Sequence, residues 1–413
     1  MDPLTVLYLT YTFISFYFLM IYILVYAQNK SEIMEVIEPD KERSLSIIIP
    51  CFNAEENIRK TIQAQLDSDY PGLKKIIVVD DCSTDNSASI IKKFTKRYKQ
   101  VLYVKTPKNT GNAAGAKNYG SKFVKTELIG FSDDDSIPQK TAISKMVGFF
   151  NDAKVGAVTS RVLITGKKNF LTESQAIEYK IIAFTRKLLG FLESIYVTNG
   201  PLSIYRKTAF DEVNGFDEKN LTEDIEITWH FVAKGWKVQM AIPAIAYTHP
   251  PSKVKAWFKQ RIRWNVGGLQ TVAKYRKQFL NTGMLGLFIM PFFIFSWFLG
   301  ITGLFFLSYR FSQYLIMKYL VTKYSIIADV PLITAKELTL NPSILFFFGM
   351  LLFALGLIYT VVGLVYSKEE GRFTGHKIRD IFIYSIFYLL MYPPLLIWSF
   401  YKYLRGYNKW GTK

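Results

Sequence analysis

Long apolar runs constrain this chain more than any other feature of its sequence. No charged side chain lies between Asp2 and Lys30, and this run is long enough to cross a bilayer as a helix. It lacks a basic start and a small-residue cleavage site, so it is predicted to be an anchor and not a signal peptide. Three further candidate spans lie towards the C-terminus, at 284–307, 344–366 and 381–400. Four spans are therefore expected.

The net charge of +18 must be read together with a chain that is 50% hydrophobic. Such apolar content indicates a membrane protein with basic cytoplasmic faces, so nucleic acid is not expected as a partner. The two cysteines, Cys51 and Cys82, match no zinc or redox spacing. The segment Phe311–Ile327 is apolar but carries Lys318 and Lys323, and it is predicted to lie along the membrane interface.

The middle of the chain, residues 44–280, has globular character. The first two predicted strands are β-branched runs without polar alternation, which is typical of strands buried on both faces. Strand and helix alternate with short turns, which predicts a parallel α/β sheet. The predicted strands are 45–49, 75–79, 101–104 and 128–132, and the predicted helices are 55–67, 86–99 and 112–124. Polar clusters follow three of these strands, at the edge where such sheets bind ligands.

Three consecutive carboxylates, Asp133, Asp134 and Asp135, follow the fourth predicted strand. Because they repel one another, we expect them to be exposed or neutralised, and oxygen ligands suit Mg²⁺ or Mn²⁺. A solvated acidic turn is the alternative. The segment Gly111–Lys117 lacks the spacing of a phosphate loop, so metal and cations would hold phosphates instead. Lys117 is one candidate, with a solvated helix lysine as the alternative.

Five motifs occur in one order along the chain, and 35 residues separate Asp224 from Gln260. The motifs are Ile49–Asn57, Val78–Asp85, Asp133–Asp135, Thr222–Asp224 and Gln260–Trp264. This pattern resembles the family 2 inverting glycosyltransferases with a GT-A fold. It is most similar to the membrane-embedded branch that holds the hyaluronan, chitin, cellulose and poly-N-acetylglucosamine synthases.

The resemblance implies an α/β GT-A domain with a Rossmann-like mixed sheet, as in nucleotide-diphospho-sugar transferases, joined to an α-helical transmembrane bundle. The expected domains are an N-terminal anchor at 1–28, a cytoplasmic catalytic domain at 44–250, interfacial amphipathic helices at 251–281 and a C-terminal region of about three spans at 282–413.

The resemblance also implies roles for individual residues. Asp224 would be the general base that takes the proton from the acceptor hydroxyl. Asp135, with Asp133, would hold the Mg²⁺ or Mn²⁺ and the diphosphate. Donor-binding residues would be Pro50, Phe52, Glu55, Asp81, Lys117, Asp133, Asp134, Gln260 and Arg263. Acceptor-binding residues would be Glu223 and Trp264.

Two of these motifs have alternative interpretations. Gln260, Arg263 and Trp264 share one helix face, with a fork for diphosphate oxygens and a flat surface for a sugar ring, which Trp257 would extend. An interfacial helix anchored on lipid headgroups is the alternative. Thr222 also predicts a helix N-cap followed by acidic residues. His249, a lone histidine, is predicted to be structural.

The predicted function is transfer of a sugar with inversion from a nucleotide sugar, a UDP-sugar, to a growing polysaccharide, which the spans would export through a channel. The expected partners are the nucleotide-sugar donor, a saccharide or lipid-linked acceptor, and membrane lipids. A non-processive transferase acting on a lipid or lipid-linked acceptor is the first alternative. A transporter is disfavoured, because no charged residue interrupts the four spans. The expected location is the plasma membrane, with several spans and a cytoplasmic catalytic domain.

Overall fold

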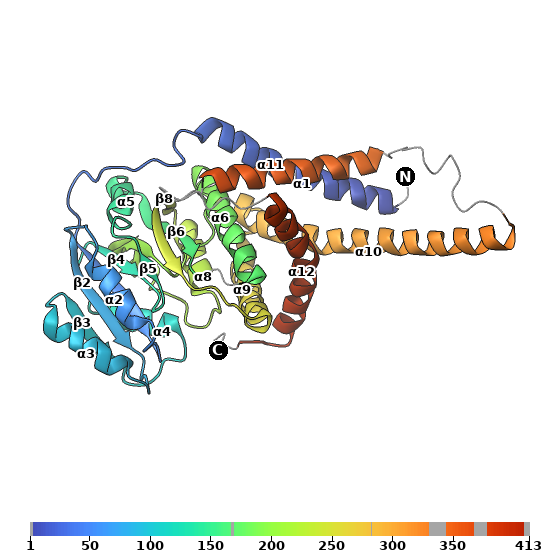
Figure 1. Cartoon of the computed structure of the whole chain (residues 1–413). Helices are drawn as coiled ribbons and strands as arrows, with labels where there is room; N and C mark the ends of the chain where they lie inside the picture. Colours follow the sequence, from blue (N-terminus) through green and yellow to red (C-terminus); the bar gives the residue numbers. More distant parts are fainter. Residues whose placement is uncertain (1–2, 167–168, 282, 330–343, 367–377, 409–413) are drawn as a thin grey trace.

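The computed structural model describes residues 3–166, 169–281, 283–329, 344–366 and 378–408. It contains one mixed sheet flanked by helices, with four long apolar helices to one side (Figure 1). The strands are β1 (Leu45–Cys51), β2 (Leu73–Asp80), β3 (Val101–Lys105), β4 (Leu128–Phe131), β5 (Ile137–Pro138), β6 (Val155–Ile164), β7 (Ser203–Arg206) and β8 (Lys237–Thr248). The α-helices are α1 (Pro3–Asn29), α2 (Ile58–Leu66), α3 (Ser87–Arg97), α4 (Ala113–Ser121), α5 (Ser144–Val147), α6 (Phe170–Phe191), α7 (Lys207–Glu212), α8 (Glu223–Ala233), α9 (Val254–Tyr275), α10 (Met290–Ile327), α11 (Ile344–Tyr366) and α12 (Ile378–Leu404).

The eight strands lie in the order β3-β2-β1-β4-β7-β6-β8-β5. The first four in this order are parallel, as the alternating pattern predicts. The prediction of a parallel sheet is wrong for part of the other half, because β7 runs antiparallel to both β4 and β6, and β5 runs antiparallel to β8, whereas β6 and β8 are parallel. The mixed sheet that the family resemblance implied is confirmed. Its parallel half brings the ends of β1, β2 and β4 to one edge.

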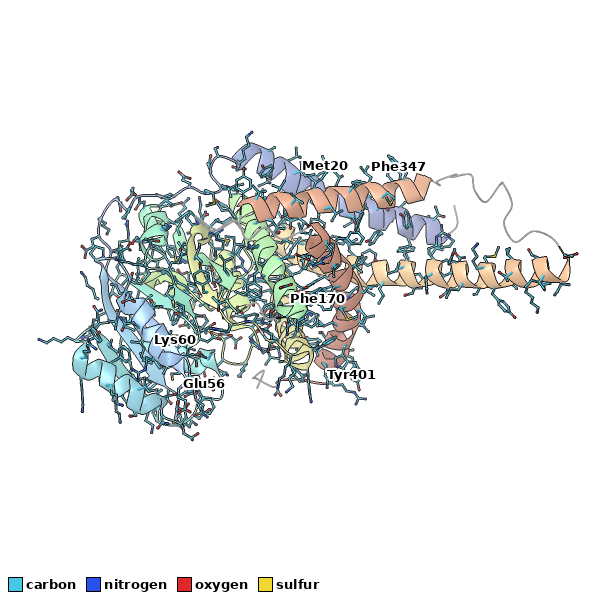
Figure 2. All side chains as sticks on the ribbon, in the orientation of Figure 1. Met20, Glu56, Lys60, Phe170, Phe347 and Tyr401 are labelled. Carbon is cyan, nitrogen blue, oxygen red and sulfur yellow. The ribbon has the colours of Figure 1, made fainter. Side chains whose placement is uncertain are left out.

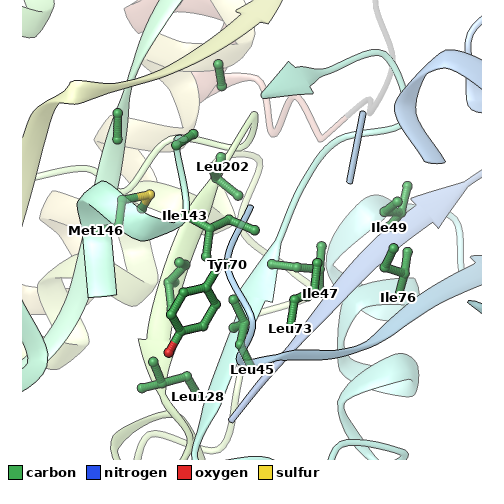
Figure 3. Packing of buried hydrophobic residues seen from close by; sticks show 14 of the residues in the cluster. Leu45, Ile47, Ile49, Tyr70, Leu73, Ile76, Leu128, Ile143, Met146 and Leu202 are labelled. Carbon is green, nitrogen blue, oxygen red and sulfur yellow. The ribbon is translucent and has the colours of Figure 1, made fainter. Parts of the chain in front are cut away.

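Helices cover both faces of this sheet, which explains why β1 shows no polar alternation. Alternate residues of β1, such as Ile47 and Ile49, pack towards α2, α3 and α5, and Figure 3 shows them in the same apolar cluster as Met146 of α5. Ile48 points to the other face, where it packs among residues of α4, α6 and α8 such as Phe184. Burial on both faces therefore makes the strand apolar throughout.

Four helices are long and apolar enough to cross a membrane, in agreement with the four predicted spans. They cover Pro3–Asn29, Leu285–Ile327, Phe347–Tyr366 and Arg379–Leu404. The segment Phe311–Ile327, which was predicted to lie along the membrane interface, continues α10 without a break, and α10 itself follows a π-helical segment, Leu285–Ile289. Apolar side chains such as Met20 and Phe347 are exposed on α1 and α11, whereas charged ones such as Glu56 cover the opposite end of the molecule (Figure 2).

Helices α6 and α9 join the sheet to the apolar helices. Helix α6 packs on β6 and β8 and also contacts α1, α11 and α12, while α9 packs between α8 and α12. A hydrogen bond between polar side chains also crosses one of these contacts: the hydroxyls of Thr185 in α6 and Tyr359 in α11 are 2.7 Å apart. The elements that carry the predicted site are therefore held directly against the membrane helices.

Candidate active site

The acidic cluster lies in the turn that follows β4. The Oδ1 atom of Asp133 is 3.5 Å from the Nζ atom of Lys117. Burial, and then the charge of Asp133, raise the pKa of Asp135 to about 6, although the nearby His249 acts in the opposite direction. The backbone oxygen of Asp134 accepts a hydrogen bond of 2.8 Å from Thr61 of α2. Contacts with Thr61 and Lys117 therefore fix the position of this acidic turn, and His249 is close enough to affect the charge of Asp135.

Asp133 and Asp135 are the residues that could hold a divalent cation. Their repulsion disfavours ionisation of Asp135, and a hard cation with oxygen ligands would relieve that cost. Among the described residues, no group of three or more His, Cys, Asp or Glu side chains is arranged to hold a metal ion. The donor set therefore fits an ion whose remaining ligands are diphosphate and water, as is usual for Mg²⁺.

Lys117 is buried between two carboxylates, so its alternative interpretation as a solvated lysine is wrong. It is 2% exposed, and its Nζ atom is 3.0 Å from Glu223 and 3.5 Å from Asp133. Burial by itself would lower the pKa of Lys117, but these two carboxylates raise it well above its usual value. Lys117 therefore stays charged and ties the acidic turn after β4 to the start of α8.

Asp224 occupies the first turn of α8. Burial, and then the charge of Glu223, raise the pKa of Asp224 to about 6, while Arg263 and Lys117 oppose this shift. Burial acts in the same direction on Glu223, but Lys117 and Arg263 outweigh it and lower the pKa of Glu223. The two adjacent carboxyls thus differ in basicity, and Asp224 is the stronger base.

Thr222 occupies the N-cap position of α8 and acidic residues follow it, as predicted, but its side chain makes no capping hydrogen bond. Its hydroxyl instead donates to Asn220 at 3.3 Å. Helix α9 approaches closely here, because a methyl group at Gly267 would lie 2.8 Å from the Cβ atom of Thr222. This approach also brings the Nη1 atom of Arg263 to the backbone oxygen of Leu221, at 2.9 Å.

The other predicted site residues of α9 differ in how deeply they are buried. Trp264 is half-buried, and the guanidinium of Arg261 lies 4.0 Å from its ring centre. The Oε1 atom of Gln260 is enclosed and has no hydrogen-bond partner among the described residues. Trp257 does not extend this face, because it is fully buried against Phe387 of α12.

Arg261 forms a buried network that the sequence pattern did not reveal. It pairs with Glu178 of α6, and the hydroxyl of Tyr388 in α12 donates to the same carboxylate oxygen at 2.6 Å. Glu178 and Arg261 are 83 positions apart in the chain, so no local spacing indicates the pair. The network joins α6, the motif helix α9 and the last apolar helix, α12.

The predicted donor residues of β1 and β2 meet at one edge of the sheet. Pro50 is buried, Phe52 is exposed, and Glu55 accepts hydrogen bonds of 2.9 Å from the backbone and side chain of Asn86. The Oδ1 atom of Asp81 accepts hydrogen bonds from the hydroxyl of Thr106 and the backbone N–H of Thr110, at 2.8 and 3.0 Å. Its Oδ2 atom accepts from the backbone N–H and the hydroxyl of Thr110, at 3.1 and 2.8 Å. A nucleoside that bonds to Asp81 would have to displace some of these contacts, so the donor roles stay predictions.

Taken together, the mixed sheet with its acidic turn forms a domain of the GT-A type, joined to four helices long and apolar enough to cross a membrane. Residues 46–213 match the family model described as Glycosyl transferase family 2. They therefore form a glycosyltransferase family 2 domain, which confirms the family predicted from the order of the motifs.

Curated relatives extend this similarity beyond the family domain. The chain is 29% identical over 257 residues to a poly-beta-1,6-N-acetyl-D-glucosamine synthase of Staphylococcus epidermidis, an alignment that covers 62% of each protein. It is 28% identical over 269 residues to the synthase of the same name in Staphylococcus aureus strain COL, covering 65% of this chain and 64% of that protein. The chain thus matches less than two thirds of the length of these relatives.

The overall fold is similar to that of a solved mannosyltransferase from Pyrobaculum calidifontis, whose structure contains GDP-Man and Mn²⁺. The TM-score is 0.59 at 16% sequence identity, and the match covers 98% of this chain and 99% of the other. At this identity the similarity concerns the fold alone.

Proposed function

We propose that this protein transfers N-acetylglucosamine with inversion from UDP-N-acetylglucosamine to a growing polysaccharide at the membrane. The observation that carries the proposal is the arrangement of a basic carboxyl, Asp224, joined through Glu223 and Lys117 to the acidic turn after β4. The similarity to synthases of a β-1,6-linked N-acetylglucosamine polymer supports the choice of sugar.

Asp224 would act on the acceptor. Its carboxylate accepts the proton of the acceptor hydroxyl, whose oxygen then bonds to the anomeric carbon as the bond from that carbon to the diphosphate breaks. A single displacement of this kind inverts the configuration. Because the pKa of Asp224 is about 6, the group is ionised at neutral pH and yet more basic than an ordinary aspartate.

The leaving diphosphate develops negative charge, and three groups would oppose that charge. Arg263 offers a planar fork of donors beside Asp224 and Glu223. Lys117 is a permanent cation next to Asp133. A divalent ion at Asp133 and Asp135 would supply further charge stabilisation when bound. Trp264, stacked on Arg261, offers a flat apolar surface for the acceptor ring.

Product analysis tests this function. The purified protein in detergent or nanodiscs receives UDP-N-acetylglucosamine, UDP-glucose or GDP-mannose, each labelled in the sugar, and the product is sized on a gel. A long labelled polymer from UDP-N-acetylglucosamine is expected. A single added sugar on an extracted lipid would favour the non-processive alternative, and no incorporation from any donor would overturn the proposal.

The catalytic domain would face the cytoplasm, where nucleotide sugars are available, and basic segments of the domain favour that side. A cysteine introduced at the exposed Lys96 should react with an impermeant thiol reagent only after cells are permeabilised. Reaction in intact cells would contradict this orientation.

A further inference from the structure

Helix α6 carries a buried arginine that forms no ion pair with any described residue. Arg186 is 7% exposed, and its Nε atom is enclosed with no hydrogen-bond partner among the residues that the structure describes. Burial lowers the pKa of Arg186, which reflects the free-energy cost of placing a cation there. Buried charges are normally paired, so an unpaired guanidinium next to a candidate catalytic group calls for a ligand.

The groups that act on the charge of Arg186 include the candidate base. After burial, the groups that act most strongly on its charge are Tyr196, Asp224 and Tyr179. The ring of Tyr196 packs 4.9 Å from that of Phe293 in α10, and Thr198, two residues further on, donates to the backbone oxygen of Asp224 at 3.4 Å. Arg186 thus lies within the electrostatic reach of the first turn of α8, close to the segment that joins this turn to α10.

The guanidinium also remains reachable. Of its nitrogens, only Nε is both enclosed and unpaired. The terminal nitrogens form no hydrogen bond or ion pair with the described part of the chain, and they are not among its enclosed atoms, so solvent can contact them. Water would occupy this position in the free protein, and a ligand with several oxygen atoms could replace it.

We propose that Arg186 is an acceptor-binding residue whose terminal nitrogens donate hydrogen bonds to hydroxyl and carbonyl oxygens of the acceptor saccharide beside Asp224. This assignment rests on the proposed function and names the group that holds the chain end. A neutral saccharide is favoured over a phosphate, because Asp224 and Glu223 already supply negative charge at this position and would repel a second anion.

The neighbouring residue offers a matched control. Lys187 is also buried, at 5% exposed, and lies on the same helix. Its ammonium group lies over the rings of Phe149 and Phe191, and the carboxylates that act on it are Glu35 and Glu32. Arg186→Met and Lys187→Met therefore each remove one buried cation from α6, but only the first removes it from beside the candidate base.

The test measures donor and acceptor kinetics separately. The full-length protein receives UDP-N-acetylglucosamine and a β-1,6-linked N-acetylglucosamine pentasaccharide, and UDP affinity is measured by calorimetry. Arg186→Met should lose about tenfold to a hundredfold in kcat/KM for the pentasaccharide, as expected for a charged hydrogen-bond donor, while UDP affinity stays unchanged. Arg186→Lys should recover part of this loss, and Lys187→Met should behave like the wild type.

Hydrogen exchange gives a measurement that needs no variant. The pentasaccharide should slow amide exchange around Arg186 in the wild-type protein, whereas polyprenyl phosphate should not. This measurement decides the matter if Arg186→Met fails to bind UDP and so fails to fold. Absence of protection, or protection by the lipid phosphate alone, would overturn the assignment.

Failure of the two proposals can be told apart. An active wild type whose Arg186→Met variant keeps its kcat/KM for the pentasaccharide overturns the acceptor role of Arg186 and leaves the proposed function standing. A wild type that transfers no N-acetylglucosamine overturns the proposed function, and this proposal with it.

Discussion

The acid limb of the pH–rate profile tests Asp224 as the base. Burial and the charge of Glu223 raise the pKa of Asp224 to about 6, against the effects of Arg263 and Lys117. A base must be ionised to accept a proton, so turnover should fall as the pH drops through this pKa. Roughly nine tenths of the groups are ionised at pH 7 and roughly a tenth at pH 5, so the rate should fall about tenfold.

Three variants sharpen this test. Asp224→Asn keeps the size of the side chain but cannot accept a proton, so turnover should drop by about 10²–10⁴ with UDP affinity retained. Glu223→Gln removes the charge that helps to raise the pKa of Asp224, so its acid limb should move to lower pH. Asp217→Asn is the control, because this half-buried carboxylate pairs with Lys274 instead, and its profile should match the wild type.

The assay must separate the base from the metal site, since the pKa of Asp135 is also raised to about 6. Turnover is therefore measured with saturating Mn²⁺ and donor, and UDP affinity is measured at each pH by calorimetry. A rate that stays constant down to pH 4.5 would refute the reasoning. Near-normal turnover in Asp224→Asn would do so as well, and Glu223 would then be the next carboxyl to examine.

Three further predictions concern the metal site, a close contact in the active site and the buried ion pair. Asp135→Asn should weaken Mn²⁺ and UDP binding together, and full wild-type activity in excess chelator would rule out the metal role. In Gly200→Ala the new methyl group would lie 2.9 Å from the Cγ atom of Asp133 and would displace that carboxylate, so kcat/KM should fall about a hundredfold while thermal stability is kept. Gly356→Ala is the control, because among the described residues no atom beyond the neighbouring backbone lies within 4 Å of the added methyl group. Glu178→Gln leaves a buried guanidinium on α9 unpaired and should cost about 3–5 kcal/mol, seen as a lower melting temperature, whereas exposed Glu173→Gln on the same helix should leave the melting temperature unchanged.

Local patterns were sufficient for the elements whose burial is uniform. An uncharged run such as Pro3–Asn29 has one stable state, a helix in lipid, and the sequence alone predicts it. The strands of the parallel half are continuous apolar runs between turns, so their positions were also predictable. The order of the motifs, from Asp81 to Trp264, identified the family, because each motif is a short contiguous stretch.

The tertiary structure alone decided how these stretches meet. Lys117 is a buried cation and not a solvated lysine, because its ammonium group reaches Glu223 at the start of α8, 106 positions away in sequence. The hydroxyl of Thr222 bonds to Asn220 and does not cap its helix, and Gly267 of α9 lies close against this threonine. Arg186 and Arg261 sit on different helices, and only the fold pairs Arg261 with Glu178 while it leaves the Nε atom of Arg186 without a partner among the described residues. Hydrogen bonds and the interactions between charges depend on the distance between atoms in space, whereas sequence periodicity and motif spacing describe only positions along the chain.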